Sequence, residues 1–281
     1  MTEAVLSDSD IAAQVWQNAS RSAPKATAGT HMPPLNATDV YDLIAANLKD
    51  PEPIISPLLF EGDLMMIYGW RGVGKTWFEL GLAYAIASGG LFLTWQCTRP
   101  RRVLVLDGEM RAARLKKRLS LIIAGSDIEA EKGYLRILTR DMVPDVVEWP
   151  DLGRAEGREA LGQLIETEQP DVIVVDNLSA WLRSGKGEND EESWRDCASW
   201  LMQQRAKGRA VVLIHHAGKG GQQRGTSRRE DILDTVICLK KPDDYDPADG
   251  MRCEFVFEKA RNLDGAEIVA ERDTDIEGVL V

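Results

Sequence analysis

Apolar and polar residues follow one another along this chain in blocks whose lengths and periods predict alternating strands and helices. Residues 64–68 form a short apolar run, which is typical of a buried strand. In residues 75–88 the apolar side chains recur at helical spacing, and the glycine pair at 89–90 ends that helix. The first clear unit of the chain is therefore a strand, a loop and a helix.

The same alternation continues downstream. Further strands are predicted at residues 102–107, 134–139, 171–176 and 210–215, and further helices at 110–124, 158–167 and 190–207. After residue 226 the pattern changes, and three segments predict a closing β-meander at 234–239, 252–259 and 267–272. We therefore expect an α/β fold with a mainly parallel central sheet and a C-terminal antiparallel β extension.

The N-terminal region differs in composition from this alternating part. Residues 1–35 are polar and rich in Ala, Ser, Thr and Pro, so we interpret them as an arm with the composition of disordered segments, apart from a short helix within 7–18. Residues 36–57 are expected to form an amphipathic helix at 38–48 and a proline-rich lead-in. We assign residues 58–281 to one domain.

The loop after the first core strand carries a phosphate-binding motif. Its residues fit the P-loop pattern G-x-x-x-x-G-K-[ST] and are Gly69, Trp70, Arg71, Gly72, Val73, Gly74, Lys75 and Thr76. Glycines let backbone N–H groups converge on phosphate oxygens, and the helix N-terminus adds partial positive charge. We expect Lys75 to reach the β and γ phosphates of ATP and the Thr76 hydroxyl to bind Mg²⁺, and we include Trp77 in the nucleotide-binding set.

Two further strand ends carry acidic residues. Asp176 ends the apolar strand at 172–176, which is the position of a Mg²⁺-binding Walker B aspartate. The next residue is Asn177, so the catalytic base has to come from another strand. Glu109 lies just past the end of the strand at 103–107, where it could accept a proton from the attacking water. Asp107 is the second candidate, and the alternative for Glu109 is an acid that only favours a helix N-terminus.

A polar tip and two glycine-bearing loops follow later strands. His215 and His216 end the strand at 210–215, where a polar group could sense the γ-phosphate. The loop at 217–226 is glycine-rich, polar and basic, as expected for backbone contact with a nucleic acid strand. We therefore take Lys219 and Arg224 from this loop, and Lys186 from the loop at 184–189, as candidates for contact with nucleic acid. The alternative is that both loops are solvated linkers.

Charge and cysteine content narrow the classes of function. A protein that coats duplex DNA usually carries a broad basic face, whereas this chain has a net charge of −11, so we expect any contact with nucleic acid to be local. The four scattered cysteines contain no C-x-x-C pair, which indicates a reducing cytoplasm and no zinc site. No apolar run is long enough to cross a membrane, and the acidic N-terminus does not resemble a secretory signal. One basic cluster is interpreted as a solvated helix face and contains Arg111, Arg114, Lys116, Lys117 and Arg118.

These motifs together resemble the RecA-like core ATPases, and among them the RepA-like group of hexameric replicative helicases. The resemblance covers about residues 58–270 and rests on the P-loop, on Glu109, on Asp176 with Asn177, and on the histidine pair with Lys219. It implies a RecA-like P-loop NTPase core, a ring of identical subunits, Mg²⁺-ATP and single-stranded DNA as a partner. It also implies a finger residue that acts in trans, for which Lys259 and Arg261 are the candidates.

Two other functions remain open at this point. The chain could be an ATP-switched oligomeric regulator that recruits a protein partner without unwinding DNA, which its acidity favours. It could also be a small-molecule kinase, although no arginine-rich lid for a second substrate is obvious in the sequence.

Overall fold

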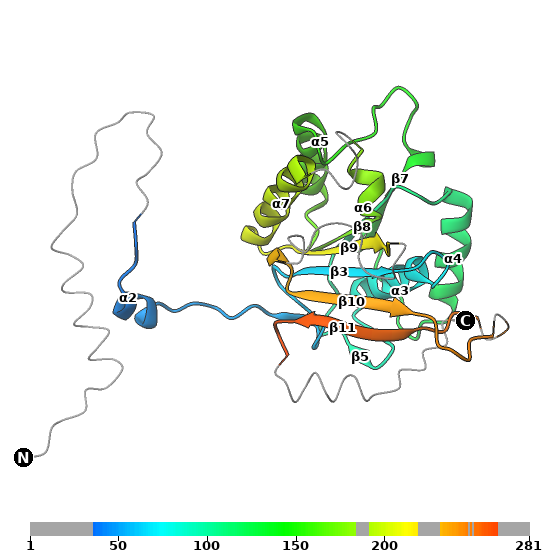
Figure 1. Cartoon of the computed structure of the whole chain (residues 1–281), viewed down its shortest axis with the longest axis horizontal. Coiled ribbons are helices and arrows are strands. Elements are labelled where there is room, and N and C mark those ends of the chain that lie inside the picture. The colour runs from blue at the N-terminus through cyan, green and yellow to red at the C-terminus, as the bar shows by residue number, and fades with distance from the viewer. Residues whose placement is uncertain (1–35, 184–190, 219–230, 247, 249, 264–281) are drawn as a thin grey trace, which may run out of the picture. The chain divides into compact units, whose positions relative to one another are not determined.

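The predicted alternation of strands and helices is present in the computed structural model, which describes residues 36–183, 191–218, 231–246, 248 and 250–263 (Figure 1). The strands of the main sheet are β3 (Leu64–Gly69), β6 (Val103–Asp107), β7 (Leu135–Thr139), β8 (Val172–Asp176), β9 (Ala210–His216), β10 (Thr235–Lys240) and β11 (Glu254–Ala260). Their order across the sheet is β11-β10-β3-β9-β8-β6-β7. The P-loop strand β3 is therefore an inner strand between β10 and β9, and all of its residues are buried.

Helices and short hairpins complete the described part. The helices are α2 (Val40–Ala45), α3 (Lys75–Ser88), α4 (Ala112–Ala124), α5 (Ala155–Glu168), α6 (Leu178–Trp181) and α7 (Glu191–Ala206), with a 3-10 turn at Arg140–Met142. Two small antiparallel hairpins pair β1 (Pro53–Ile55) with β2 (Leu59–Phe60) and β4 (Leu91–Phe92) with β5 (Trp95–Gln96). No helix of the described residues is long and apolar enough to cross a membrane.

The C-terminal strands differ in part from the predicted meander. Strand β10 pairs with β3 in parallel, and among the described strands of the main sheet only the β10–β11 pair is antiparallel (Figure 1). The apolar run at 235–239 is fully buried, so it forms an inner strand between β3 and β11 instead of the first strand of a separate meander. The third predicted strand, 267–272, lies outside the described residues. Within the described residues, the expected antiparallel extension therefore consists of the single strand β11.

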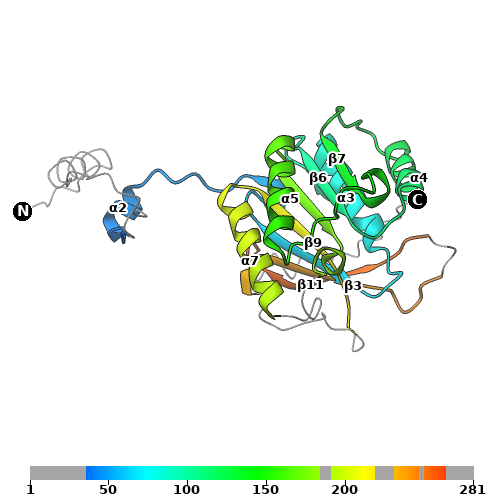
Figure 2. The same ribbon diagram turned by 90° about the horizontal axis from the view of Figure 1, so that it is seen from above.

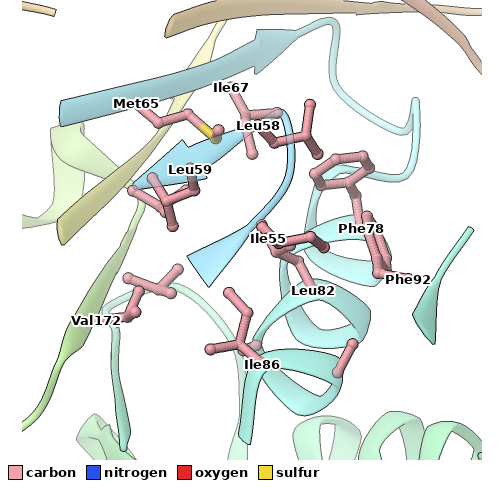
Figure 3. Packing of buried hydrophobic residues seen from close by; sticks show 14 of the residues in the cluster. Ile55, Leu58, Leu59, Met65, Ile67, Phe78, Leu82, Ile86, Phe92 and Val172 are labelled. Atoms are coloured by element: carbon pink, nitrogen blue, oxygen red, sulfur yellow. The ribbon is translucent and has the colours of Figure 1, made fainter. Parts of the chain in front are cut away.

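Alternating side chains of β3 pack on the two faces of the sheet. Met65 and Ile67 belong to a core cluster with α3 and the β1–β2 hairpin (Figure 3). Leu64, Met66 and Tyr68 belong to a second cluster with residues of α5, α6 and α7, and Figure 2 shows α5 and α7 on the opposite side of the sheet from α3. This alternation is the period of a strand with two buried faces, and it fixes the register of β3 because a shift of one residue would exchange the two sets.

Two boundaries near the N-terminus differ from the prediction. Helix α2 covers residues 40–45 instead of 38–48, and its apolar side chains, Val40 and Ile44 among them, are exposed. A helix this short has little stability without a packing partner, which accounts for its early end. The compact unit that contains the sheet begins at Pro51 and not at residue 58, because Ile54 and Ile55 are fully buried in the core.

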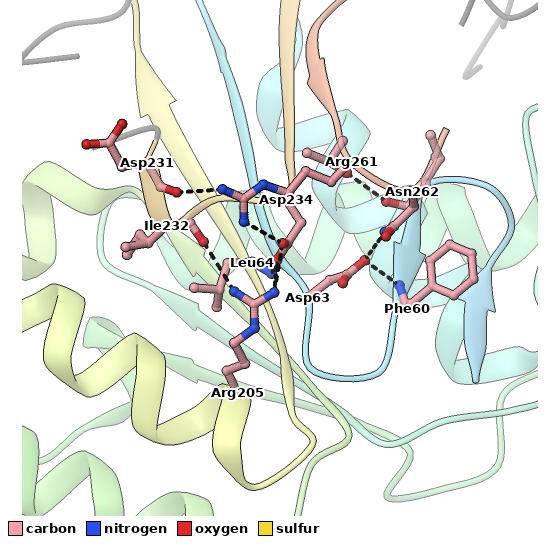
Figure 4. A network of polar contacts seen from close by, with 11 residues as sticks. Phe60, Asp63, Leu64, Arg205, Asp231, Ile232, Asp234, Arg261 and Asn262 are labelled. Atoms are coloured by element: carbon pink, nitrogen blue, oxygen red, sulfur yellow. Dashed lines mark hydrogen bonds and ion pairs between the residues drawn. The ribbon is translucent and has the colours of Figure 1, made fainter. Parts of the chain in front are cut away.

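A polar network joins β3, β10 and β11 at the amino-terminal ends of the parallel strands (Figure 4). The buried carboxylate of Asp234 accepts two hydrogen bonds of 2.7 Å from the Arg205 guanidinium and one of 2.9 Å from the Leu64 backbone N–H. It also accepts a bond of 3.3 Å from Arg261. The neighbouring Asp63 carboxylate accepts a bond from the side-chain amide of Asn262 at 2.6 Å. This network ties the start of the P-loop strand to the end of the chain's described part.

Asp63 makes the stability of the fold depend on pH. Burial raises the pKa of its carboxyl from 3.8 to about 6. Folded Asp63 therefore keeps its proton to a higher pH than in the unfolded chain, and the free energy of unfolding falls as the pH rises from about 4 to about 6. Asp63→Asn cannot ionise and keeps an oxygen that can accept the hydrogen bond of the Phe60 backbone N–H.

We expect the stability of Asp63→Asn relative to the wild type to increase by about 2 kcal/mol between pH 4.5 and pH 7.5, because part of the effect of the pKa shift is already present at pH 4.5. Urea denaturation at a series of pH values measures this difference, and Asp127→Asn at an exposed position is the matched control. A difference between Asp63→Asn and the wild type that stays constant over this range would contradict the prediction.

Candidate active site

The register of the parallel strands brings four strand ends to one edge of the sheet. Gly69 at the end of β3 pairs with His216 at the end of β9, and Asp107 at the end of β6 pairs with Asp176 at the end of β8. Because β3, β9, β8 and β6 are neighbours, the residues that follow these ends lie close together. Ligands of open parallel sheets bind at this carboxyl edge.

The P-loop connects β3 to α3 in the conformation that its glycines permit. Gly72 has φ 78° and Gly74 has φ 106°, which are values that residues with a side chain rarely adopt. Helix α3 begins at Lys75, so the loop and the helix N-terminus present backbone N–H groups to the same side. This arrangement is the one that the sequence motif predicts.

Beside the P-loop lies a cavity of about 570 Å³. The predicted site residues that line it are Arg71, Gly72, Gly74, Lys75, Thr76, Trp77, Glu109, Asp176 and His216. Three predicted nucleotide-binding residues do not line the cavity: Gly69 ends the strand, Val73 is buried in the core, and the Trp70 side chain is 51% exposed. Glu109 thus shares a cavity with Lys75, although the two are far apart in the sequence.

Lys75 is held against its own loop. Its Nζ donates hydrogen bonds of 2.9 Å to the backbone carbonyls of Gly69 and Trp70, and its side chain is buried. Burial lowers the pKa of this ammonium group, while the nearby carboxylates of Asp176 and Glu109 act in the opposite direction. A triphosphate in the cavity would offer Lys75 anionic partners in place of the two carbonyls.

Glu109 is held by two residues from neighbouring strand ends. The Asn177 side-chain amide donates a hydrogen bond to Glu109 Oε2, and His216 Nε2 lies 3.4 Å from the same oxygen. Asn177 Nδ2 and His216 Nε2 are 3.0 Å apart, so the three side chains form one cluster. The contact with His216 is the main cause that lowers the pKa of Glu109, which keeps this carboxylate ionised.

Asp107, the second candidate for the base, has a different position. It is buried, and its Oδ1 accepts hydrogen bonds from the backbone N–H groups of Glu109 (3.1 Å) and Met110 (3.0 Å). Asp107 therefore shapes the turn that presents Glu109 and does not line the cavity. Of the two acids, the geometry favours Glu109 as the residue that reaches a substrate.

The residues around Asp176 fit a magnesium ion bound together with phosphates. Asp176 is buried, its Oδ2 has no hydrogen-bond partner among the described residues, and burial raises its pKa to about 6. Thr76 lines the same cavity. No group of three or more His, Cys, Asp or Glu residues in the described part could hold a metal by itself. Mg²⁺ is commonly bound by one or two protein oxygens plus substrate phosphates and water, and Thr76 with Asp176 suits that mode.

Several predicted residues lie away from the cavity or outside the described part. His215 is fully buried below the cavity edge, beside Tyr68 of β3. Lys259 and Arg261 lie near the amino-terminal ends of the parallel strands, whereas the P-loop lies at their carboxyl ends. Lys259 pairs with Val236, which is near the start of β10. The loop candidates Lys186, Lys219 and Arg224 lie outside the described residues. The roles of all these residues stay predictions.

The basic cluster is predicted to form a solvated helix face, and four of its five residues, Arg111, Arg114, Lys116 and Lys117, are exposed, while Arg118 is half-buried. Arg111, Arg114 and Arg118 also line the cavity, whereas Lys116 and Lys117 do not. The spacing of 111, 114 and 118 places these three on one face of α4. This spacing is the feature of the sequence from which their common position at the cavity could have been predicted. The contact of Asn177 with Glu109 had no such signal, because it joins two strand ends.

We expect removal of the His216 imidazole to raise the pKa of Glu109, because the carboxylate then loses its principal stabilising contact. Asn177→Ala should give an upward shift of smaller size, and Lys116→Ala on exposed α4 surface should give none. Carboxyl ¹³C NMR of glutamate-labelled protein measures the titration, with the signal assigned by its loss in Glu109→Gln. An unchanged titration midpoint in His216→Ala would refute the contact.

Comparison with known proteins agrees with this geometry. A family model described as an AAA domain, AAA_25, matches residues 31–222. A search of curated protein sequences gave no match. Among solved structures, the chain is similar to a KaiC-like protein from the hyperthermophilic archaeon Pyrococcus horikoshii, with TM-score 0.52 and 15% identity over 74% of this chain and 83% of that one. It is also similar to the flagellar accessory protein FlaH from Methanocaldococcus jannaschii, with TM-score 0.48 and 13% identity over 71% and 79% of the two chains.

The structural likeness bears on the fold, and the family match covers more than half of the chain. The mainly parallel sheet agrees with the structural likeness, and the P-loop, Glu109 and Asp176 all lie within the residues that the family model matches. The chain therefore belongs to the AAA_25 family of AAA domains, as a P-loop ATPase with a RecA-like fold.

Proposed function

We propose that this chain is a Mg²⁺-dependent ATP hydrolase that works as a ring-forming motor on single-stranded DNA. The observation that carries the hydrolase part is the shared cavity, in which Lys75, Glu109 and Asp176 face one space of about 570 Å³. Lys75 begins α3, Glu109 follows the end of β6, and Asp176 ends β8. Lys75 suits phosphate binding, Glu109 suits the activation of water, and Asp176 suits metal binding. The motor part rests on the resemblance to RepA-like helicases and on the two glycine-bearing loops at 184–189 and 217–226.

The chemistry follows from the position of each group. The P-loop N–H groups and Lys75 bind the β and γ phosphates, so that Lys75 leaves the carbonyls of Gly69 and Trp70. A Mg²⁺ ion bound by Thr76, Asp176 and the phosphates would neutralise part of the phosphate charge. Glu109 accepts a proton from water as the water oxygen bonds to the γ-phosphorus. The bond from that phosphorus to the β–γ bridging oxygen breaks, and ADP and phosphate leave.

Asn177 and His216 connect this chemistry to the loops. Asn177 holds Glu109 with its amide group and also begins α6, where its Oδ1 accepts the Ala180 backbone N–H at 3.1 Å. His216 is the last residue of β9, just before the loop at 217–226. A change at Glu109 during hydrolysis would therefore reach the segments that carry Lys186, Lys219 and Arg224. We propose that these loops hold and move the DNA strand.

A ring of identical subunits is the proposed assembly, with Lys259 or Arg261 of one subunit acting at the site of the next. The structural observation that bears on this proposal is that both residues lie near the amino-terminal ends of the parallel strands, away from the cavity of their own chain. A second candidate function is a regulator that assembles on ATP and recruits a protein. The net charge of −11 favours it, because DNA binding then depends wholly on local basic loops.

We expect Lys75→Ala to remove most ATP hydrolysis, since the transition state loses a positive charge at the γ-phosphate. Glu109→Gln should lower kcat by about 100-fold or more while ATP still binds, because general-base catalysis contributes about that much. Phosphate release measures turnover, and fluorescence of a labelled ATP analogue measures binding. Lys117→Ala on the exposed surface of α4 is the control. Wild-type turnover in Lys75→Ala would show that another protein causes the activity.

Single-stranded DNA should stimulate ATP hydrolysis by the wild type, and a Lys219→Ala, Arg224→Ala double variant should lose this stimulation while basal hydrolysis stays intact. The physical reason is that phosphate contacts by Lys and Arg supply most of the affinity for a strand. Turnover with and without DNA at low salt, together with native mass, measures both stimulation and assembly. ATP-dependent assembly without DNA affinity would select the regulator instead.

A further inference from the structure

Helix α4 presents three arginines to the cavity that holds Lys75 and Glu109. Arg111 is the N-cap residue of α4, and Arg114 and Arg118 follow on the same face at helical spacing. The lysines at 116 and 117 are exposed and do not line this cavity. Arg71 and Lys75 of the P-loop line the same cavity and already supply two cations for a triphosphate. The arginines of α4 are therefore additional positive charge that faces the same space.

These arginines differ in their contacts. The Arg118 guanidinium lies 5.2 Å from the centre of the Trp77 ring and donates a 3.3 Å hydrogen bond to Met110 Sδ, which joins α4 to the first turn of α3. Arg114 is exposed and forms no ion pair within the described part of the chain. It lies in the first helical turn, one turn closer than Arg118 to the segment that carries Glu109. Its position is thus held by a rigid helix while its guanidinium can reach a ligand.

The expected finger residues of this same chain do not reach its own cavity. Arg261 lies at the opposite edge of the sheet, where it donates 2.8 Å and 3.3 Å hydrogen bonds to the Asp231 carbonyl and the Asp234 carboxylate. A transition state at the γ-phosphate spreads negative charge over three oxygens, and an arginine fork is well suited to bind it. Of the two arginines within α4 that line the cavity, Arg118 contacts Trp77 and Met110, whereas Arg114 forms no ion pair with another described residue.

We propose that Arg114 is a catalytic residue that acts in cis: its guanidinium stabilises the charge that develops on the γ-phosphoryl oxygens, while Arg118 and Trp77 hold α4 in place as positioning residues. This inference rests on the proposed ATP hydrolysis. This contribution is separate from the one proposed for Lys259 or Arg261 of a neighbouring subunit.

The test compares Arg114→Ala with Arg114→Lys and with the control Lys117→Ala. Loss of one preorganised donor to a transition state lowers kcat by about 100-fold or more, so we expect that loss in Arg114→Ala with ATP affinity within a few-fold of the wild type. Arg114→Lys should recover part of kcat because it keeps the charge, and Lys117→Ala should equal the wild type. Because residue 114 is exposed, we expect all variants to fold, and thermal melting checks this.

A mixing experiment separates action in cis from action in trans. Lys75→Ala chains carry an intact Arg114, and Arg114→Ala chains carry an intact P-loop. If Arg114 acts in cis, the mixture has no more activity than the sum of its parts. Activity recovered on mixing would overturn the inference and assign Arg114 to a neighbouring copy.

Other outcomes are equally decisive. Unchanged kcat in Arg114→Ala overturns this inference alone, because the wild type and Lys75→Ala still show whether the chain hydrolyses ATP. Loss of ATP affinity with unchanged kcat would make Arg114 a residue of ground-state binding and would also overturn it. Absence of turnover in the wild type, at a level equal to Lys75→Ala, would overturn the proposed function and the inference together.

Discussion

The backbone register of four neighbouring parallel strands is the constraint on which the site depends. It places Gly69 beside His216 and Asp107 beside Asp176, so that the P-loop, the proposed base and the proposed metal ligand meet at one edge. A shift of one residue in β8 would turn Asp176 to the other face of the sheet. The buried apolar residues of these strands oppose such a shift, since both faces of the sheet are packed.

That constraint also concentrates buried acids below the cavity. Asp176, Asp107 and Glu79 are all almost completely buried, and burial raises the pKa of each carboxyl. Within the described residues none of the three forms an ion pair, and the nearby ammonium of Lys75 is bonded to backbone carbonyls. Burial without an opposite charge costs free energy, which cations in the cavity would offset. The arginines of α4 and a metal ion at Asp176 would both act in that direction.

The two edges of the sheet have separate physical roles. The carboxyl edge carries the loops, the cavity and the side chains proposed for chemistry. The amino edge carries the network around Asp234, in which Arg205 and Arg261 share one buried carboxylate and fasten β10 and β11 to β3. The strands are thus fastened at the edge away from the cavity, so the polar contacts that fix their register are separate from the side chains proposed for chemistry.

Local patterns in the sequence were sufficient for the P-loop, for Asp176 and for the order of strands and helices, because each depends on residues that are neighbours in the chain. Glu109 could be placed near Lys75 because parallel strands share a carboxyl edge. Packing between distant segments decided three other features. These are the parallel pairing of β10, the contact of Asn177 with Glu109, and the position of Arg111, Arg114 and Arg118 beside the cavity. A single sequence does not encode such contacts as a local period, and only the assembled sheet determines which strand ends become neighbours.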